Sequence, residues 1–148
     1  MTVCDLGCGP GFFSLEMAQL VSASGKVIAV DMQEVMLDRI MKKVAGTKLE
    51  QRIVLHQCED KNVGVTEKVD FVLAFYMIHE VPDQETLFNE LISILKPNGL
   101  IFIIEPKFHV SKQSFNQMIA KLEAIGLKII ERPKVFFSRA IVLKYIDN

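Results

Sequence analysis

The chain has 148 residues, of which 50% are hydrophobic and 24% are charged, and its formal net charge is −1. This length and composition predict one globular domain spanning residues 1–148, and they exclude a disordered chain, a collagen-like repeat and a small disulfide scaffold. The near-neutral charge gives no reason to expect nucleic acid or an anionic membrane as a partner, although it leaves room for a local basic patch. No apolar run reaches about 18 residues, so no transmembrane helix is expected.

The three cysteines do not have the spacing of a paired motif. Cys4, Cys8 and Cys58 form no CxxC pair, and their number is odd. This usage is typical of reduced thiols and predicts a cytoplasmic protein. Because the spacing is wrong for a zinc site and no His cluster follows, we expect no metal. Cys58 falls in a predicted strand and is interpreted as a core residue.

Short apolar runs alternate with longer stretches of helical period along most of the chain. The runs are nearly continuous, as expected for strands buried on both faces. They are Val3–Leu6, Val27–Val30, Ile53–Leu55, Phe71–Phe75 and Leu100–Ile104. Between and after them, apolar residues recur at helical spacing, in the groups Phe13/Met17/Leu20/Val21, Met36/Ile40/Val44, Leu87/Leu91/Ile94/Leu95 and Phe115/Ile119/Leu122/Ile125. Strands alternating with helices predict right-handed βαβ units, a mainly parallel sheet and helices on both of its faces.

The last part of the chain does not continue the alternation of strands and helices. Pro97-Asn98-Gly99 is a turn signal before the fifth strand, and after Gly126 the segments Leu127–Arg132 and Ala140–Ile146 read as two strands with no helix between them. Strands joined by so short a loop must be antiparallel. The sequence therefore predicts seven strands, the last of them antiparallel.

A glycine-rich loop follows the first predicted strand. After Asp5, glycines stand at alternate positions, Gly7, Gly9 and Gly11, just before a predicted helix. They allow a tight turn and close backbone approach, and the helix offers free N–H groups that suit a carboxylate or a phosphate. The dinucleotide fingerprint GxGxxG is not matched, because Phe12 stands where its third glycine would be. A turn with only a packing role is the alternative.

Acidic residues follow the next two predicted strands. Ligands of open α/β sheets bind beyond the carboxyl ends of the strands. Asp31 ends the second strand, 20 residues after Gly11, and could accept both hydroxyls of a ribose. The alternative is a helix cap, because Asp31 to Glu34 resembles a capping box. Glu59 and Asp60 follow the third strand and could receive an adenine amine, or they could form a solvated acidic turn.

Four segments in order resemble the motifs of class I S-adenosylmethionine-dependent methyltransferases. They are Val3–Ser14, Val27–Asp31, Val69–Asp83 and Leu95–Pro106. The resemblance is closest to the ubiquinone/menaquinone-biosynthesis type, the methyltransferase type 11 branch. It runs from Val3 to Tyr145 and implies the α/β Rossmann-like methyltransferase fold. It also implies methyl transfer from S-adenosyl-L-methionine to a small-molecule acceptor by in-line displacement, with S-adenosyl-L-homocysteine as product.

The resemblance implies roles for particular residues. The cofactor-binding set is Asp5, Gly7, Gly9, Gly11, Asp31, Met32, Glu59, Asp60, Ala74 and Phe75. The glycines would cradle the methionine part, with Asp5 near its amino group directly or through water. Asp31 would hold the ribose, and Met32 would pack on the adenine. Glu59, with Asp60 as fallback, would contact the adenine amine.

The candidate catalytic residues are Tyr76 and His79, which follow the fourth predicted strand. Methyl transfer needs a general base only where the acceptor must lose a proton, so the sequence demands none. His79 could be that base, because a His titrates near neutral pH, and Tyr76 could line the acceptor site. The alternative for His79 is a hydrogen-bonded residue that fixes the loop. Glu80, Glu105 and His109 are expected at the solvated rim.

One departure from the family bears on the function. Only Met1–Cys4 precede Asp5, whereas the family usually carries lid helices before the first strand. The alternatives are a fragment, a truncated paralogue, or a lid supplied by a second copy or a partner chain. The competing function is a cofactor-binding or scaffold subunit without its own transferase activity. A nicotinamide-dependent oxidoreductase is the third hypothesis, and the glycine spacing argues against it.

The residues after the fourth predicted strand bear on the acceptor. Members of the fold that methylate base amines tend to carry Asn/Asp-Pro-Pro-Tyr/Phe there, and this chain has Ala74-Phe75-Tyr76-Met77. We therefore expect a small-molecule acceptor rather than nucleic acid.

Overall fold

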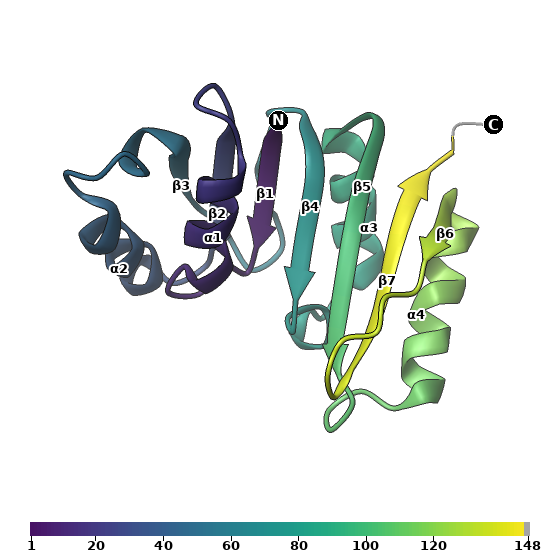
Figure 1. The fold of residues 1–148 in the computed structure, drawn as a ribbon. Coiled ribbons are helices and arrows are strands. Elements are labelled where there is room, and N and C mark those ends of the chain that lie inside the picture. Colours follow the sequence, from purple (N-terminus) through teal and green to yellow (C-terminus); the bar gives the residue numbers. More distant parts are fainter. Residues whose placement is uncertain (147–148) are drawn as a thin grey trace.

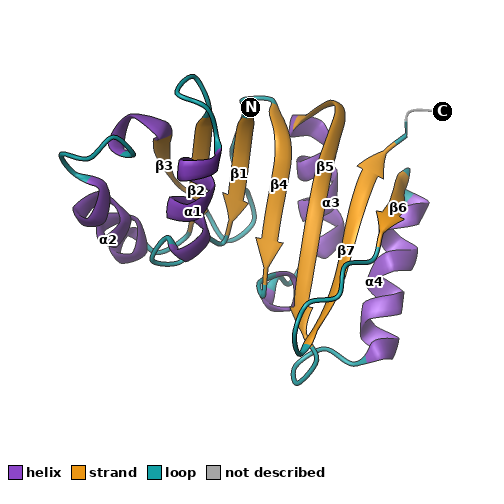
Figure 2. Ribbon diagram, viewed as in Figure 1, coloured by secondary structure: helices purple, strands orange, loops and turns teal. Residues whose placement is uncertain are grey.

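The computed structural model describes residues 1–146, which form one seven-stranded sheet flanked by helices (Figures 1 and 2). The strands are β1 (Thr2–Leu6), β2 (Lys26–Asp31), β3 (Ile53–Gln57), β4 (Val69–Phe75), β5 (Leu95–Pro106), β6 (Leu127–Glu131) and β7 (Ser138–Tyr145). The helices are α1 (Phe12–Leu20), α2 (Glu34–Val44), α3 (Gln84–Ile94) and α4 (Lys112–Ala124), with 3₁₀ turns η1 (Glu50–Arg52) and η2 (Ile78–Glu80). Each predicted strand and helix is present.

The strand order is β3-β2-β1-β4-β5-β7-β6. The first five strands pair in parallel, and β7 is antiparallel to both β5 and β6. The mainly parallel sheet with an antiparallel last strand is thus confirmed. The position of β7 inside the sheet follows from burial: residues 140–143 are all buried, whereas β6 exposes much of its length and takes the edge.

Side chains of the central strands alternate between two cores. Val3 of β1 and Val27 of β2 face the core that contains Ile40 of α2. Their neighbours Cys4 and Ile28 face the larger core on the opposite side, which includes residues of α3 and α4. This arrangement places helices on both faces of the sheet, as the parallel strands require.

The helices on the α1 side lie over β1, β2 and β3 (Figure 1). Further along the same face, Leu73, Ile104 and Ala140 are buried mainly by side chains, including Phe13 of α1 and Phe75 of β4. Side chains that are mostly aromatic, two of them from α1, therefore cover the β4–β5–β7 part of this face.

Two local expectations were wrong. Leu20 was placed in the buried stripe of α1, but as the last residue of that helix it is 84% exposed. The turn at Pro97-Asn98-Gly99 was expected before β5, but β5 begins at Leu95 and contains it. Asn98 lies in the left-handed region, with φ 66°. In both cases the pattern of apolar residues predicted the helix or strand itself but misplaced one of its ends.

Candidate functional site

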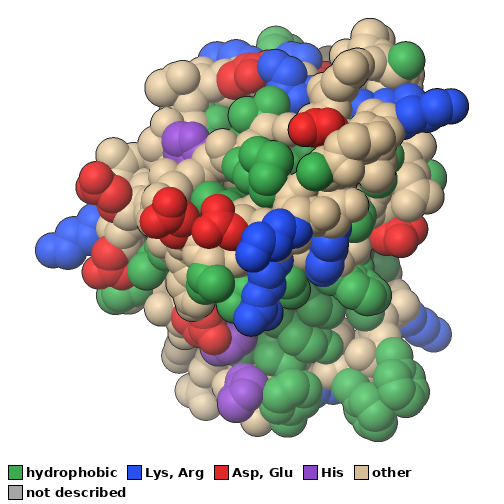
Figure 3. Space-filling view, turned by 90° about the vertical axis from the view of Figure 1, so that its left-hand side faces the viewer, with side chains coloured by type: hydrophobic (Ala, Val, Ile, Leu, Met, Phe, Trp, Pro, Cys, Tyr) green, Lys and Arg blue, Asp and Glu red, His purple; other side chains and the backbone are tan. Residues whose placement is uncertain are grey.

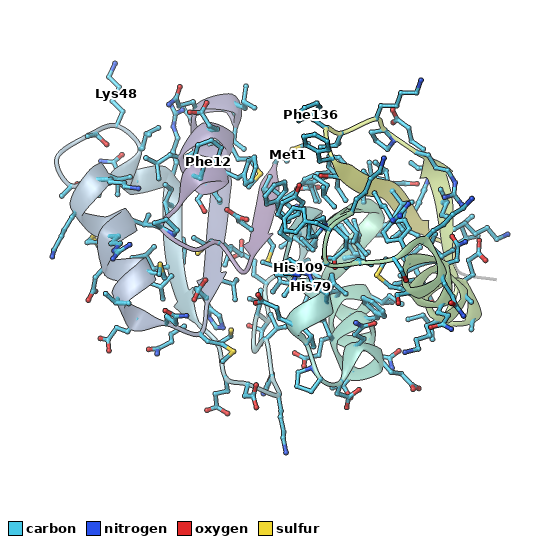
Figure 4. All side chains as sticks on the ribbon, turned by 90° about the horizontal axis from the view of Figure 1, so that it is seen from below. Met1, Phe12, Lys48, His79, His109 and Phe136 are labelled. Atoms are coloured by element: carbon cyan, nitrogen blue, oxygen red, sulfur yellow. The ribbon has the colours of Figure 1, made fainter. Side chains whose placement is uncertain are left out.

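A cleft of about 820 Å³ lies at the carboxyl ends of the parallel strands, the edge that Figure 4 views from below. Several residues expected from the sequence line it: Gly7, Asp31, Met32, Glu59, Asp60, Phe75 and Tyr76. Other expected residues lie outside the lining: Asp5, Gly9, Gly11, Ala74 and His79. The sheet edge thus gathers much of the predicted set in one place, as expected for an α/β fold.

The glycine loop is tightly packed at two of its positions. Gly7 has φ +69°, and a Cβ there would lie 3.1 Å from Cβ of Met77, which follows β4. Gly11 precedes the first residue of α1 with φ +90°, and its Cβ would lie 2.6 Å from Cγ1 of Ile40. Both positions therefore require glycine for backbone and for space.

Asp31 connects the glycine loop to the turn after β2. Its Oδ2 accepts a hydrogen bond from the Gly9 N–H (2.9 Å), and its Oδ1 accepts one from the Gln33 N–H (2.9 Å). The residue that caps α2 is Gln33, so the capping box considered for Asp31 does not form. Each carboxylate oxygen has a second lone pair, so Asp31 can still accept hydrogen bonds from a ligand in the cleft.

Asp5 lies beneath the loop rather than in the cleft. It is 2% exposed, and its Oδ2 accepts a hydrogen bond from Ser14 Oγ in the first turn of α1 (2.5 Å). Burial raises the pKa of Asp5 to about 6, with a smaller contribution from the negative charge of Asp31 and partial compensation by the Ser14 bond. Its observed contact anchors α1 to the loop.

The β3–β4 connection supplies the acidic rim. Glu59 and Asp60 are exposed there, and the Glu59 backbone pairs with Asn62 across a tight turn. Cys58 was expected in the core, but it follows β3, is half-buried and lines the cleft. Burial, with the nearby charge of Asp31, raises the pKa of the Cys58 thiol, so it stays protonated at neutral pH.

Tyr76 is held in an unusual conformation directly after β4. Its φ is 55°, a left-handed value that is rare for a bulky residue and is found preferentially at functional sites. Its hydroxyl is 2.5 Å from Ser138 Oγ, and its ring stacks on Phe75 with a centroid distance of 4.0 Å. These contacts fix the ring where it lines the cleft.

Glu105 is buried next to the cleft, where it pairs with the half-buried His79. Glu105 is 1% exposed; its Oε2 lies 2.9 Å from His79 Nδ1 and accepts from the His79 backbone N–H, and its Oε1 accepts from the Ile78 N–H. Burial raises the pKa of Glu105, and the contacts with His79 oppose that shift. The expectation of a rim position for Glu105 was wrong. His79 does not line the cleft, an arrangement that favours the alternative of a residue that fixes the η2 turn.

Aromatic rings form a chain along this edge of the sheet. It runs in order through Phe12, Phe13, Phe75, Tyr76, Phe108, His109 and His79, with successive centroids 4.0–6.4 Å apart. Figure 4 shows His79 and His109 side by side near the centre of this edge. The cleft is therefore bordered by apolar, ring-shaped surface on the side of Tyr76.

Sequence reasoning named Glu80 as a rim residue but did not assign the rest of the wall that follows β4. This wall consists of Met77, residues 80–83 and the first two turns of α3. Glu90 of α3 ties this wall to the β3–β4 loop, because its carboxylate accepts from the N–H groups of Val63 (2.9 Å) and Gly64 (3.4 Å). The match to the fourth motif pointed to this region, but the spacing of residues in a sequence cannot predict that a helix will contact a distant loop. Within residues 1–146, no group of three or more His, Cys, Asp or Glu could hold a metal ion.

The sequence profile of the family described as "Methyltransferase domain" matches residues 1–134. This chain belongs to that family. A demethylmenaquinone methyltransferase of Lactobacillus johnsonii is 34% identical to this methyltransferase domain over 102 residues, which are 68% of the chain and 42% of the relative. One from Desulfitobacterium hafniense is 28% identical over 106 residues, 71% of the chain and 42% of the relative. The chain thus spans less than half the length of these curated relatives.

Solved structures agree with the fold of this methyltransferase domain. A SAM dependent methyltransferase from Aquifex aeolicus superposes with a TM-score of 0.86 at 24% identity, covering 99% of this chain and 82% of the other. The [4+2]-cyclase SpnF superposes with a TM-score of 0.75 at 17% identity, covering 89% and 53%. Because the same architecture occurs in a cyclase, the fold alone does not decide the reaction. No helix in residues 1–146 has the length and hydropathy to cross a bilayer.

Proposed function

We propose that this chain binds S-adenosyl-L-methionine in the cleft and transfers its methyl group to a small aromatic acceptor of the quinone class. The main support is that Gly7, Asp31 and Met32 line one cleft in a chain whose family profile covers residues 1–134. The donor set suits this cofactor, because Asp31 keeps free lone pairs for ribose hydroxyls and the backbone at Gly9 is open: a Cβ there would meet nothing within 4 Å.

The residues divide the cofactor between them. The methionine part is cradled by Gly7, Gly9 and Gly11. Asp5 supports this loop from beneath. Asp31 accepts from the ribose, and Met32 packs on the adenine. Glu59 is the acceptor for the adenine amine, with Asp60 as fallback. Ala74, which is fully buried at the end of β4, and Phe75 form the adjoining wall.

The bound cofactor supplies an electrophilic methyl group on a sulfonium sulfur, so the chemistry that remains for the chain is alignment. Tyr76 and Phe75 orient a flat acceptor against their stacked rings. Where the acceptor must lose a proton, His79, which lies outside the cleft lining, is the candidate general base: Glu105 occupies its Nδ1, and Nε2, 3.9 Å from Glu80 Oε1, is the nitrogen that would take the proton.

The quinone class is supported by two independent observations. Curated relatives that match this chain are named demethylmenaquinone methyltransferases. The chain of aromatic rings borders the cleft on the side of Tyr76, and an aromatic surface stacks well on a planar ring.

The test incubates the purified chain with methyl-labelled S-adenosyl-L-methionine and demethylmenaquinone, in its oxidised and reduced forms. The proposal predicts labelled, methylated product that depends on the chain. Cofactor binding without transfer to either form would favour the cofactor-binding or scaffold subunit. Absence of cofactor binding would contradict the proposal at its first step.

A further inference from the structure

Two loops outside the cofactor cleft meet at the carboxyl end of β5. They are residues 107–111 between β5 and α4 and residues 132–137 between β6 and β7, both at the lower end of the sheet in Figure 1. The Lys107 N–H donates to the Phe137 carbonyl (3.0 Å), and Arg139 Nε donates to the Val110 carbonyl (3.2 Å). These bonds join the loops into one surface.

That surface exposes phenylalanine rings. Phe108 is 72% exposed, Phe136 is 83% exposed and Phe137 is 66% exposed. The rings of Phe136 and Phe137 pack against each other with a centroid distance of 4.1 Å. Hydrophobic side chains gather along the lower right of the space-filling view in Figure 3, and Figure 4 labels Phe136 at the margin of the molecule. Exposed apolar clusters of this kind mark interaction sites.

Phe137 adopts its position at a conformational cost. Its φ is 52°, in the left-handed region that bulky residues avoid. The Lys107–Phe137 bond and the Ser138 N–H donating to the Val135 carbonyl (3.0 Å) hold the loop in this form. Strain that the surrounding bonds maintain is typical of functional loops.

The two loops also carry charge of one sign, because their charged side chains are all basic. Together they contain three Lys or Arg residues and no Asp or Glu, in a chain whose net charge is −1. These three are Lys107, Arg132 and Lys134; Lys112 of α4, Arg139 of β7 and the exposed Glu131 of β6 flank the loops. We name the exposed part of this surface the aromatic–basic patch: Lys107, Phe108, Arg132, Lys134, Phe136 and Phe137.

We propose that the aromatic–basic patch docks on the surface of a bilayer that contains anionic lipids. Phenylalanine rings insert at the boundary between headgroups and acyl chains, and Lys and Arg side chains are attracted to the anionic headgroups beside them. The net charge of the whole chain is close to zero, so it does not reveal this local excess of basic residues. The proposal goes beyond the proposed function and does not depend on catalysis.

A bilayer fits the patch better than nucleic acid does. The neighbouring cleft is lined by six carboxylates and one lysine, which would repel a phosphate backbone running across it. A flat lipid surface touches only the protruding rings and the basic side chains.

Docking in this orientation has a consequence for the cleft. The ring of Phe108 lies 6.4 Å from that of Tyr76, centroid to centroid, so the patch continues into the wall of the cleft. A chain bound through the patch would present the Tyr76 side of its cleft to the membrane interface. An acceptor dissolved in the bilayer could then approach without crossing water.

The test is co-sedimentation of the purified chain with vesicles of phosphatidylcholine, with and without an equal part of phosphatidylglycerol. We expect binding to the mixed vesicles. The variant F136S/F137N should bind about 10-fold or more weakly, because two rings no longer insert. The variant K107Q/K134Q should lose about 5-fold per charge on mixed vesicles and nothing on phosphatidylcholine. The matched control is L20S, which removes an equally exposed apolar side chain at the end of α1 and should bind like the unmodified chain.

Thermal unfolding of each variant separates lost binding from lost folding. K107Q/K134Q changes only exposed side chains and keeps the proposal testable if F136S/F137N does not fold. Failure of the unmodified chain to bind mixed vesicles would overturn the proposal. So would equal binding by F136S/F137N and L20S, or tighter binding to single-stranded RNA than to the mixed vesicles with the same dependence on the patch.

Discussion

Gly9 and Gly46 are a matched pair of residues for testing the glycine loop. Their φ angles are +53° and +74°, and a Cβ on either would meet nothing within 4 Å. Alanine at either position should lower the free energy of unfolding by roughly 1–2 kcal/mol, because both must adopt a left-handed conformation. Only Gly9→Ala should also abolish cofactor binding, since its methyl group would project into the open space proposed for the methionine part of the cofactor.

Calorimetric titration and urea unfolding of both variants provide the measurement. If Gly46→Ala and Gly9→Ala bind S-adenosyl-L-methionine equally well, the loop has only the packing role considered from the sequence.

The buried carboxyl of Asp5 predicts a pH dependence of stability. Its folded-state pKa of about 6 lies above the ordinary value of 3.8, so the fold disfavours the ionised form. The stability that Asp5 contributes below pH 4 is therefore lost as the pH rises through about 6, by an amount on the order of 2–3 kcal/mol. Asp5→Asn removes this titration, while its amide oxygen can still accept from Ser14.

Urea unfolding of both proteins at pH 4.5 and pH 7 measures the effect. The difference in unfolding free energy should move in favour of Asp5→Asn as the pH rises. A difference that is the same at both pH values would show that Asp5 has an ordinary pKa in the folded chain.

The η2 turn between β4 and α3 depends on one carboxylate. Glu105 accepts from two backbone N–H groups of this turn and contacts the His79 ring. Glu105→Gln places an amide N–H₂ among these donors and should cost about 2–4 kcal/mol of stability. Glu80→Gln changes an exposed carboxylate 3.9 Å from the same His79 ring and should change stability by less than about 0.5 kcal/mol.

Thermal and urea unfolding of these two variants make the comparison. Because Met77, just before the turn, and Glu80, its last residue, line the cleft, Glu105→Gln should weaken cofactor binding as well. Equal stability of the two variants would mean that the turn is held by its other contacts.

The sequence predicted most of the strands and helices because their apolar patterns are local. It could not place β7 between β5 and β6, since that choice depends on how much of each strand the assembled sheet buries. It pointed to Asp31 from its position at the end of a strand and to Met32 from the family resemblance, and both residues line the cleft. It gave Glu105 a rim position and Cys58 a core position, because the burial of a residue at a strand end is decided by loops that approach from elsewhere in the chain.

Across the whole molecule, opposite charges gather on neighbouring surfaces at one edge of the sheet. The cleft proposed for the cofactor is lined by a single Lys or Arg residue, Lys61, and by six acidic ones: Asp31, Glu59, Asp60, Glu80, Asp83 and Glu90. Such a cleft favours a cationic ligand, and salt screens the attraction. Raising the ionic strength from about 0.01 M to 0.15 M should weaken binding of the sulfonium S-adenosyl-L-methionine roughly 3-fold or more.

S-adenosyl-L-homocysteine, which lacks the sulfonium charge, is the matched ligand for this measurement. Its affinity should change less over the same range of salt. Equal salt dependence of the two ligands would show that the cleft's charge does not act on the sulfonium.

The central claim is that this cleft is a cofactor site, and calorimetric titration of the purified chain with S-adenosyl-L-methionine tests it most directly. We predict a dissociation constant on the order of micromolar, weakened about 10-fold or more by Asp31→Ala and unchanged by Asp38→Ala, which removes an exposed carboxylate of α2 outside the cleft. Absence of binding by the folded chain, or equal binding by the two variants, would contradict the assignment of this cleft.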